Sequence, residues 1–139
     1  MVFGSRIVQE MFEHALNAPV HADGHREEAC GIVAGENGQP VRFIPVENVE
    51  HSPTRYRADD RDVLRIQREL DQGELDILGI FHSHTHTAAY PSSTDVTLAI
   101  GWPDQIFLIA SLMHEQPRLR AFWIRNGKVE EEEISFLEA

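Results

Sequence analysis

The chain has 139 residues, a length that suits a single domain over 1–139 built around one hydrophobic core. Hydrophobic residues make up 42% of the chain, which is typical of a globular protein and argues against a disordered one. The formal net charge of −11 argues against binding to nucleic acid, which requires a basic face, and equally against docking on an anionic membrane.

The cysteine content and the N-terminus favour a cytoplasmic protein. Cys30 is the only cysteine, so an intramolecular disulfide and a four-cysteine zinc site are both excluded. Charges at Arg6, Glu10 and Glu13 interrupt the apolar centre that a signal peptide needs. The apolar runs are also too short to span a bilayer. We therefore expect a reducing compartment.

The first half of the chain predicts one helix and a hairpin. Apolar residues recur at helical spacing over 5–17, with Ser5 as the expected N-cap. The small apolar run at 29–35 predicts a buried strand, and a turn signal then leads to a second strand over 41–48. Because Pro45 lacks an N–H donor, this second strand is expected at a sheet edge or at a bulge.

The second half alternates between helices and strands. A helix is expected over 59–72, a buried strand over 76–84 and another helix over 92–101. The tail predicts a run of strands at 105–112, 118–125 and 128–136, the last of which carries four consecutive glutamates that suit a charged sheet edge. The interspersed elements predict an α+β fold with a curved mixed β-sheet flanked by helices.

Three histidines fall on alternate positions where the strand over 76–84 ends, in the stretch FHSHTHTAAYPSSTD. Side chains two apart on a strand point to the same side, so His82 and His84 are expected to project together. Two adjacent imidazoles either bind a metal or are polar groups whose burial beside a hydrophobic core costs free energy. A catalytic zinc takes three protein ligands, and either His86 or Asp95 is a candidate for the third.

Each part of this motif also has an ordinary structural interpretation. Ser92 and Asp95 fit a capping box at the start of a helix, and the histidines fit polar side chains exposed to solvent at the end of a strand. The joint pattern is more specific than its parts: His-x-His, seven residues, Ser, two residues, Asp. This pattern is the signature of the JAMM (MPN-plus) metalloproteases, and the chain resembles a small stand-alone prokaryotic member of that family.

The resemblance extends over nearly the whole chain, through EEACGIVAG, ENVEHSPTRYRADDRD, the histidine stretch, QIFLIASL and RLRAFWIRNGKVEE. It implies the JAMM/cytidine-deaminase-like sandwich fold. It also implies that His82, His84 and Asp95 bind Zn²⁺, that Glu28 is the general base and that Ser92 stabilises the oxyanion. Glu28 is preferred over its neighbour Glu27 because the glutamate of the family immediately precedes the Ala-Cys-Gly step.

The implied function is that of a zinc-dependent peptidase or isopeptidase. The resemblance implies hydrolysis of an amide bond after the C-terminal Gly-Gly tail of a ubiquitin-like or sulfur-carrier protein, with a free cysteine or a lysine side chain as the leaving amine. The alternative is a non-catalytic scaffold of the same fold, or a metal-binding interaction domain. The oligomeric state is left open, with a homodimer as one option.

Two further segments can each be interpreted in more than one way. Thr85 stands where the family often has proline, and His86 follows it. His86 could contact substrate, serve as a spare ligand, support the ligands through a hydrogen bond, or be an ordinary polar residue of a loop. Asn48, Ser52 and Tyr56 lie between the hairpin and the second long helix. The segment that contains these three residues is either a substrate-binding segment or an ordinary structured loop.

Overall fold

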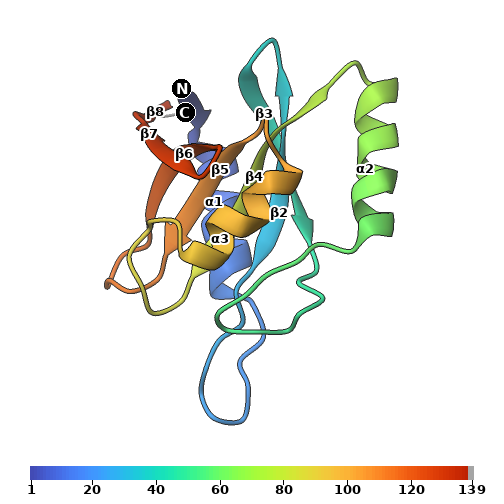
Figure 1. The fold of residues 1–139 in the computed structure, drawn as a ribbon. Coiled ribbons are helices and arrows are strands. Elements are labelled where there is room, and N and C mark those ends of the chain that lie inside the picture. Colours follow the sequence, from blue (N-terminus) through green and yellow to red (C-terminus); the bar gives the residue numbers. More distant parts are fainter. Residues whose placement is uncertain (138–139) are drawn as a thin grey trace.

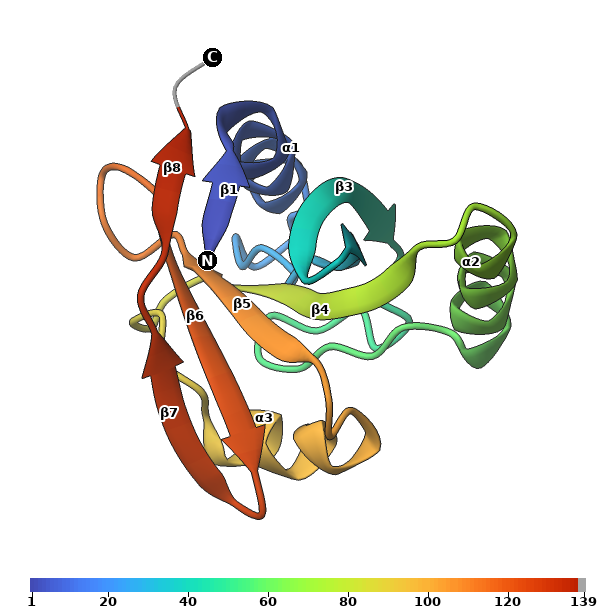
Figure 2. The same ribbon diagram turned by 90° about the horizontal axis from the view of Figure 1, so that it is seen from above.

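The computed structural model describes residues 1–137, in which helices lie on both faces of a sheet (Figures 1 and 2). Residues 138 and 139 of the domain predicted over 1–139 lie outside the described residues. In chain order the elements are β1 (Val2–Gly4), α1 (Ser5–Leu16), β2 (Cys30–Glu36), β3 (Gln39–Val46), α2 (Asp60–Gln72), β4 (Asp76–His84), α3 (Ser93–Leu98), the 3-10 helix η1 (Ala99–Gly101), β5 (Ile106–Ser111), β6 (Arg118–Arg125), β7 (Lys128–Glu132) and β8 (Ser135–Leu137).

Within residues 1–137 the main sheet has six strands, in the order β3-β2-β4-β5-β6-β7. Its central pair, β4 and β5, is parallel, and every other neighbouring pair is antiparallel. A separate parallel pair, β1 with β8, joins the two ends of the described chain. The predicted α+β class, with a mixed sheet flanked by helices, is therefore confirmed.

The sheet separates two hydrophobic cores, and successive side chains of β4 point alternately into one and the other. Phe81 packs on the side of α1, together with the apolar face of that helix. Ile80 packs on the opposite side, where Ile66 and Leu70 of α2 cover the sheet. Since side chains alternate along a strand, His82 and His84 follow Ile80 onto the α2 side. The carboxyl end of β4 thus carries two histidines to the edge of a core.

The edge strands agree with the sequence analysis. β3 is an outer strand, and Pro45 lies opposite Gly31 of β2 without having to donate to a further strand. The other outer strand is β7, which contains the first three of the four consecutive glutamates. The charged strand at this edge discourages pairing with another chain.

Two details of the predicted elements were wrong, and a third was confirmed only in part. The N-cap of α1 is Gly4 and not Ser5, because β1 pairs with β8 and leads directly into the helix. The strand predicted over 128–136 is two strands, β7 and β8, which belong to different sheets. The helix predicted over 92–101 begins as expected after Ser92, but its last turn tightens into η1.

Among the helices of residues 1–137, none has the length and apolar character needed to cross a bilayer.

Candidate metal centre

Two neighbouring elements bring His82, His84 and Asp95 together. The histidines end β4, and Asp95 lies in the first turn of α3. Nε2 of His82 lies 3.1 Å from Nε2 of His84, and the Oδ2 atom of Asp95 lies 3.1 Å and 2.9 Å from those two nitrogens. All three side chains are buried. The strand alternation predicted from sequence therefore does place both imidazoles on one side.

The three ligand-type atoms form a nearly equilateral triangle, which fits one face of a tetrahedral metal site. Bonds of about 2.0–2.1 Å from a tetrahedral ion would separate its ligand atoms by roughly 3.3–3.4 Å. The observed edges of 2.9–3.1 Å are only slightly shorter. The donor set of two imidazoles and a carboxylate also suits a divalent cation, and the residues present therefore fit a metal.

Asp95 has a structural role as well. Ser92 and Asp95 form the predicted capping box, in which the Ser92 hydroxyl accepts from the Asp95 N–H and the Asp95 carboxylate accepts from the Ser92 N–H. The capping contact fixes the carboxylate within reach of both imidazoles. The capping interpretation is confirmed, and it is compatible with metal binding by the same carboxylate.

The charges of the three groups are mutually dependent. Burial raises the pKa of Asp95, but hydrogen bonds from His82 and His84 outweigh burial and leave that pKa well below its ordinary value. Burial lowers the pKa of His82. Burial also opposes protonation of His84, but the hydrogen bonds with Asp95 and Ala88 raise its pKa overall. The pKa shifts of Asp95 and His82 favour an ionised carboxylate and a neutral imidazole, the charge states in which these groups bind a cation. The pKa shift of His84 favours its protonated form, so His84 must release a proton when a cation binds.

Glu28 lies beside this cluster, two residues before β2. Its side chain is buried, and its Oε1 atom has no hydrogen-bond partner within the described residues. Burial raises its pKa to about 8, with Asp95 adding to the increase and His84 opposing it. Glu28, His84 and Ser92 line one cavity of about 180 Å³. A buried carboxyl group with a perturbed pKa in a cavity is typical of an acid–base residue.

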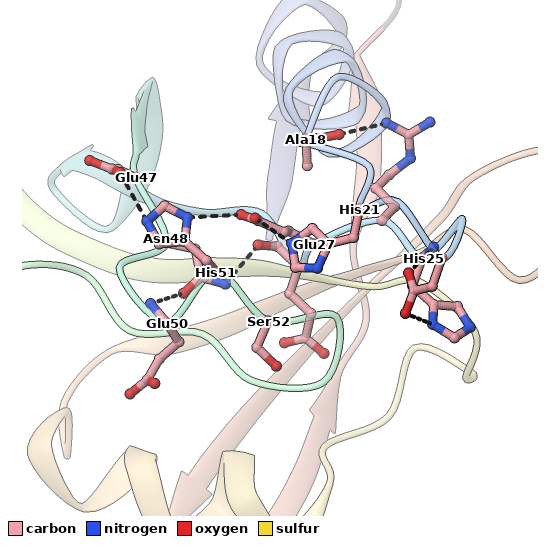
Figure 3. A network of polar contacts seen from close by, with 12 residues as sticks. Ala18, His21, His25, Glu27, Glu47, Asn48, Glu50, His51 and Ser52 are labelled. Carbon is pink, nitrogen blue, oxygen red and sulfur yellow. Dashed lines mark hydrogen bonds and ion pairs between the residues drawn. The ribbon is translucent and has the colours of Figure 1, made fainter.

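The neighbouring Glu27 is held differently (Figure 3). Its carboxylate oxygens lie 2.7 Å from Nε2 of His21 and 3.3 Å from Nδ1 of His51. It does not line the cavity that Glu28 shares with His84. Of the two candidate glutamates, the geometry therefore favours Glu28, whose side chain alone adjoins the cluster.

His86 lies apart from the cluster. β4 ends at His84, and the exposed His86 reaches the rim of the cavity, where its ring packs edge-on against His25 at 5.2 Å. Within the described residues, the group that can hold a metal contains Asp95 and not His86. Of the two candidates for a third ligand, the structure brings Asp95 to the histidines.

Two residues of the segment between β3 and α2 contribute more than the sequence indicated. The buried Asn48 donates to the carbonyl oxygens of Glu28 and Arg55 and accepts from the N–H groups of Glu50 and Arg57. Tyr56 stacks on the ring of His82. From the sequence this segment was either a substrate-binding segment or an ordinary structured loop, and neither interpretation predicted these contacts, because they depend on how distant strands assemble.

We expect the substitution Asn48→Ala to destabilise the protein, because it leaves several backbone groups without their partner. The free energy of unfolding should fall by about 2–4 kcal/mol, since each buried unpaired group costs about 1–3 kcal/mol and relaxation recovers part of this. Urea denaturation measures the loss. The exposed Asn17 provides a control, and its change to alanine should cost less than about 0.5 kcal/mol. Equal midpoints for the two variants would contradict the role of Asn48.

Comparison with known proteins gives one family and several relatives. Residues 4–125 match the model of the prokaryotic homologs of the JAB domain. A CysO-cysteine peptidase from Mycobacterium tuberculosis is 36% identical over 140 residues, covering 99% of this chain and 92% of that protein. A desampylase from Pyrococcus furiosus is 27% identical over 135 residues, covering 97% and 91% of the two chains.

Solved structures agree with the fold. The solution structure of a protein from Desulfitobacterium hafniense superposes with a TM-score of 0.85 at 32% identity, covering 100% of this chain and 94% of the other. A JAB1/MPN domain protein from Archaeoglobus fulgidus superposes with a TM-score of 0.64 at 18% identity, covering 99% and 100%. The second likeness is one of fold alone.

Proposed function

Because this chain belongs to the family of prokaryotic homologs of the JAB domain, we propose that it is a zinc-dependent peptidase that cleaves an amide bond at the C-terminus of a ubiquitin-like or sulfur-carrier protein. The relatives with matching length are named as a peptidase and as a desampylase. One name specifies CysO-cysteine, and a further relative from Thermus thermophilus, 38% identical over half of this chain, is named as a probable protease of TtuB–protein conjugates. These names support a conjugate as substrate.

His82, His84 and Asp95 would hold the metal, and their two nitrogens and one oxygen support zinc over harder cations that prefer oxygen alone. When bound, zinc supplies Lewis acidity, which polarises a carbonyl group and lets water act as a nucleophile at neutral pH. The observation that carries the proposal is the triangle of ligand atoms beside the unpartnered carboxyl oxygen of Glu28.

Glu28 would be the general base and then the general acid. Its Oε1 atom is free of hydrogen bonds within the described residues, so it can accept a proton from the attacking water. Burial raises the pKa of Glu28 to about 8. The positive charge of a bound zinc would lower this pKa toward neutral pH, where one carboxyl group can both take up and release a proton. The same atom would then deliver the proton to the leaving amine. The leaving amine would be a free cysteine or a lysine side chain.

Ser92 would stabilise the developing oxyanion. Its hydroxyl oxygen accepts from the N–H of Asp95, which leaves the hydroxyl proton to be donated into the cavity. One such donor contributes about 3–4 kcal/mol to transition-state stabilisation in enzymes where it has been removed. The capping role and the catalytic role therefore use different parts of the same hydroxyl.

The strongly acidic chain makes nucleic acid an unsuitable partner. We further propose that the protein acts in the cytoplasm, since its single cysteine is unpaired and buried.

Metal removal provides the direct functional test. The substrate is a sulfur-carrier protein whose Gly-Gly tail is joined to cysteine, or in a second assay to a lysine side chain, and mass spectrometry detects the product. Treatment with a chelator should abolish cleavage, and one equivalent of zinc should restore it. If the chelated protein cleaves at the original rate, metal dependence is wrong. If neither conjugate is cleaved by the zinc-loaded protein, the proposed substrate class is wrong.

A further inference from the structure

The two histidines of the candidate metal centre are oriented in different ways. Nδ1 of His84 donates a hydrogen bond of 2.9 Å to the carbonyl of Ala88, which fixes the ring with Nε2 toward Asp95. A hydrogen bond at the second ring nitrogen is the usual means of orienting a metal-binding histidine. Nδ1 of His82 is buried and has no such partner within the described residues. His82 therefore needs another means of orientation.

Tyr56 provides a contact of the right kind. Its ring lies parallel to the imidazole of His82, with the ring centroids 4.2 Å apart and the planes inclined by 16°. Both side chains are buried, so the imidazole cannot tilt out of its plane without displacing the phenol ring. The stacked contact fixes the plane of His82. Within that plane the ring has two orientations, related by a 180° flip. The carboxylate of Asp95, 3.1 Å from Nε2, selects the one that points Nε2 toward it.

The position of Tyr56 is itself held on both sides. Asn48 donates to the carbonyl of Arg55, 2.8 Å away, and accepts from the N–H of Arg57, 3.1 Å away. The residues immediately before and after Tyr56 are thus tied to one buried amide. This amide also donates to the carbonyl of Glu28, so the same segment is anchored beside the candidate base. Tyr56 is therefore presented to His82 by a fixed backbone.

We propose that Tyr56 is a positioning residue for the metal centre. It sets the plane of His82 by stacking, where no hydrogen bond from the described residues reaches Nδ1. The inference rests on the proposed function, because it assumes that His82 binds zinc. It assigns the role to the ring of Tyr56 and not to its hydroxyl. Loss of the ring should weaken metal binding, whereas loss of the hydroxyl alone should not.

The test is the zinc affinity of Tyr56→Phe and Tyr56→Leu, measured by competition with a chelator of known affinity. Tyr56→Leu should bind zinc about 10–100-fold more weakly, the loss typical of removing a group that orients a ligand. Tyr56→Phe should stay within about threefold of the original protein. Tyr90→Leu is the matched control: it removes the other tyrosine, whose ring packs on Phe122, and should leave zinc affinity unchanged.

A second readout separates orientation from folding. In cobalt-substituted protein, the visible spectrum reports the geometry around the ion. Tyr56→Phe should keep the spectrum of the original protein, and Tyr56→Leu should shift it. If Tyr56→Leu does not fold, Tyr56→Met serves as the aliphatic variant of similar length.

The outcomes distinguish this inference from the proposed function. Unchanged affinity and spectrum in a folded aliphatic variant would overturn the role of Tyr56 while leaving the metal centre intact. A large loss in Tyr56→Phe would overturn the assignment to the ring. Failure of the original protein to bind zinc would instead overturn the proposed function.

Discussion

The Glu28→Gln variant should bind zinc with unchanged stoichiometry and lose cleavage of a Gly-Gly-linked conjugate by about 10²–10⁴-fold, the contribution typical of a positioned acid–base group. The amide keeps the shape of the side chain but cannot carry the proton from water to the leaving amine. Glu28 lies beside His82, His84 and Asp95 but is not one of these three ligand-type residues. Metal analysis and initial rates, measured on the same preparation, check both halves of this expectation.

Glu27→Gln is the matched control for that experiment. Glu27 is the adjacent residue and receives the same substitution, but its carboxylate contacts His21 and His51 and not the cavity. Its turnover should stay within about tenfold of the original rate, since both contacts that the substitution changes lie outside the cavity. Full activity in Glu28→Gln would assign the proton transfer to another group. A greater loss in Glu27→Gln than in Glu28→Gln would reverse the assignment of the two glutamates.

The His84→Ala variant should lose both zinc and activity. Removing one of three protein ligands should weaken zinc binding by more than about 100-fold, beyond the loss expected from removing a group that only orients a ligand. Activity should fall in parallel, because the same ion is required for turnover. Zinc content after gel filtration and the cleavage rate provide the two measurements.

His86→Ala is the control for this ligand. His86 is only two residues from His84, but it is exposed and lies outside the cluster. Its zinc content should remain at one equivalent. If His84→Ala retained full zinc occupancy while His86→Ala lost it, His86 would be the ligand and the loop after β4 would have to rearrange around the ion.

The sequence predicted those parts of the fold and site that depend on local rules. The alternation along β4 placed His82 and His84 on one side, and the Ser-x-x-Asp spacing predicted the capping box that holds Asp95. The resemblance to JAMM metalloproteases is confirmed by the family match. The roles of Glu28 and Ser92 stay predictions, which the variants above test.

What the sequence could not provide depends on contacts between distant segments. β1 is three residues long and forms only because β8, more than 130 residues later, lies beside it. That pairing also displaced the expected N-cap at Ser5. Tyr56 and His82 are 26 residues apart, and no local periodicity links them. The stacked pair follows from the way the segment before α2 crosses the end of β4.

A crystal structure of the protein grown with zinc, with anomalous diffraction recorded on both sides of the zinc absorption edge, would decide whether His82, His84 and Asp95 bind the ion. We predict one strong anomalous peak within about 2.0–2.2 Å of His82 Nε2, His84 Nε2 and a carboxylate oxygen of Asp95. The carboxyl group of Glu28 should lie beside the ion without ligating it. A peak elsewhere, or His82, His84 and Asp95 remaining in mutual contact with no ion bound at saturating zinc, would show that these three residues are not the zinc site.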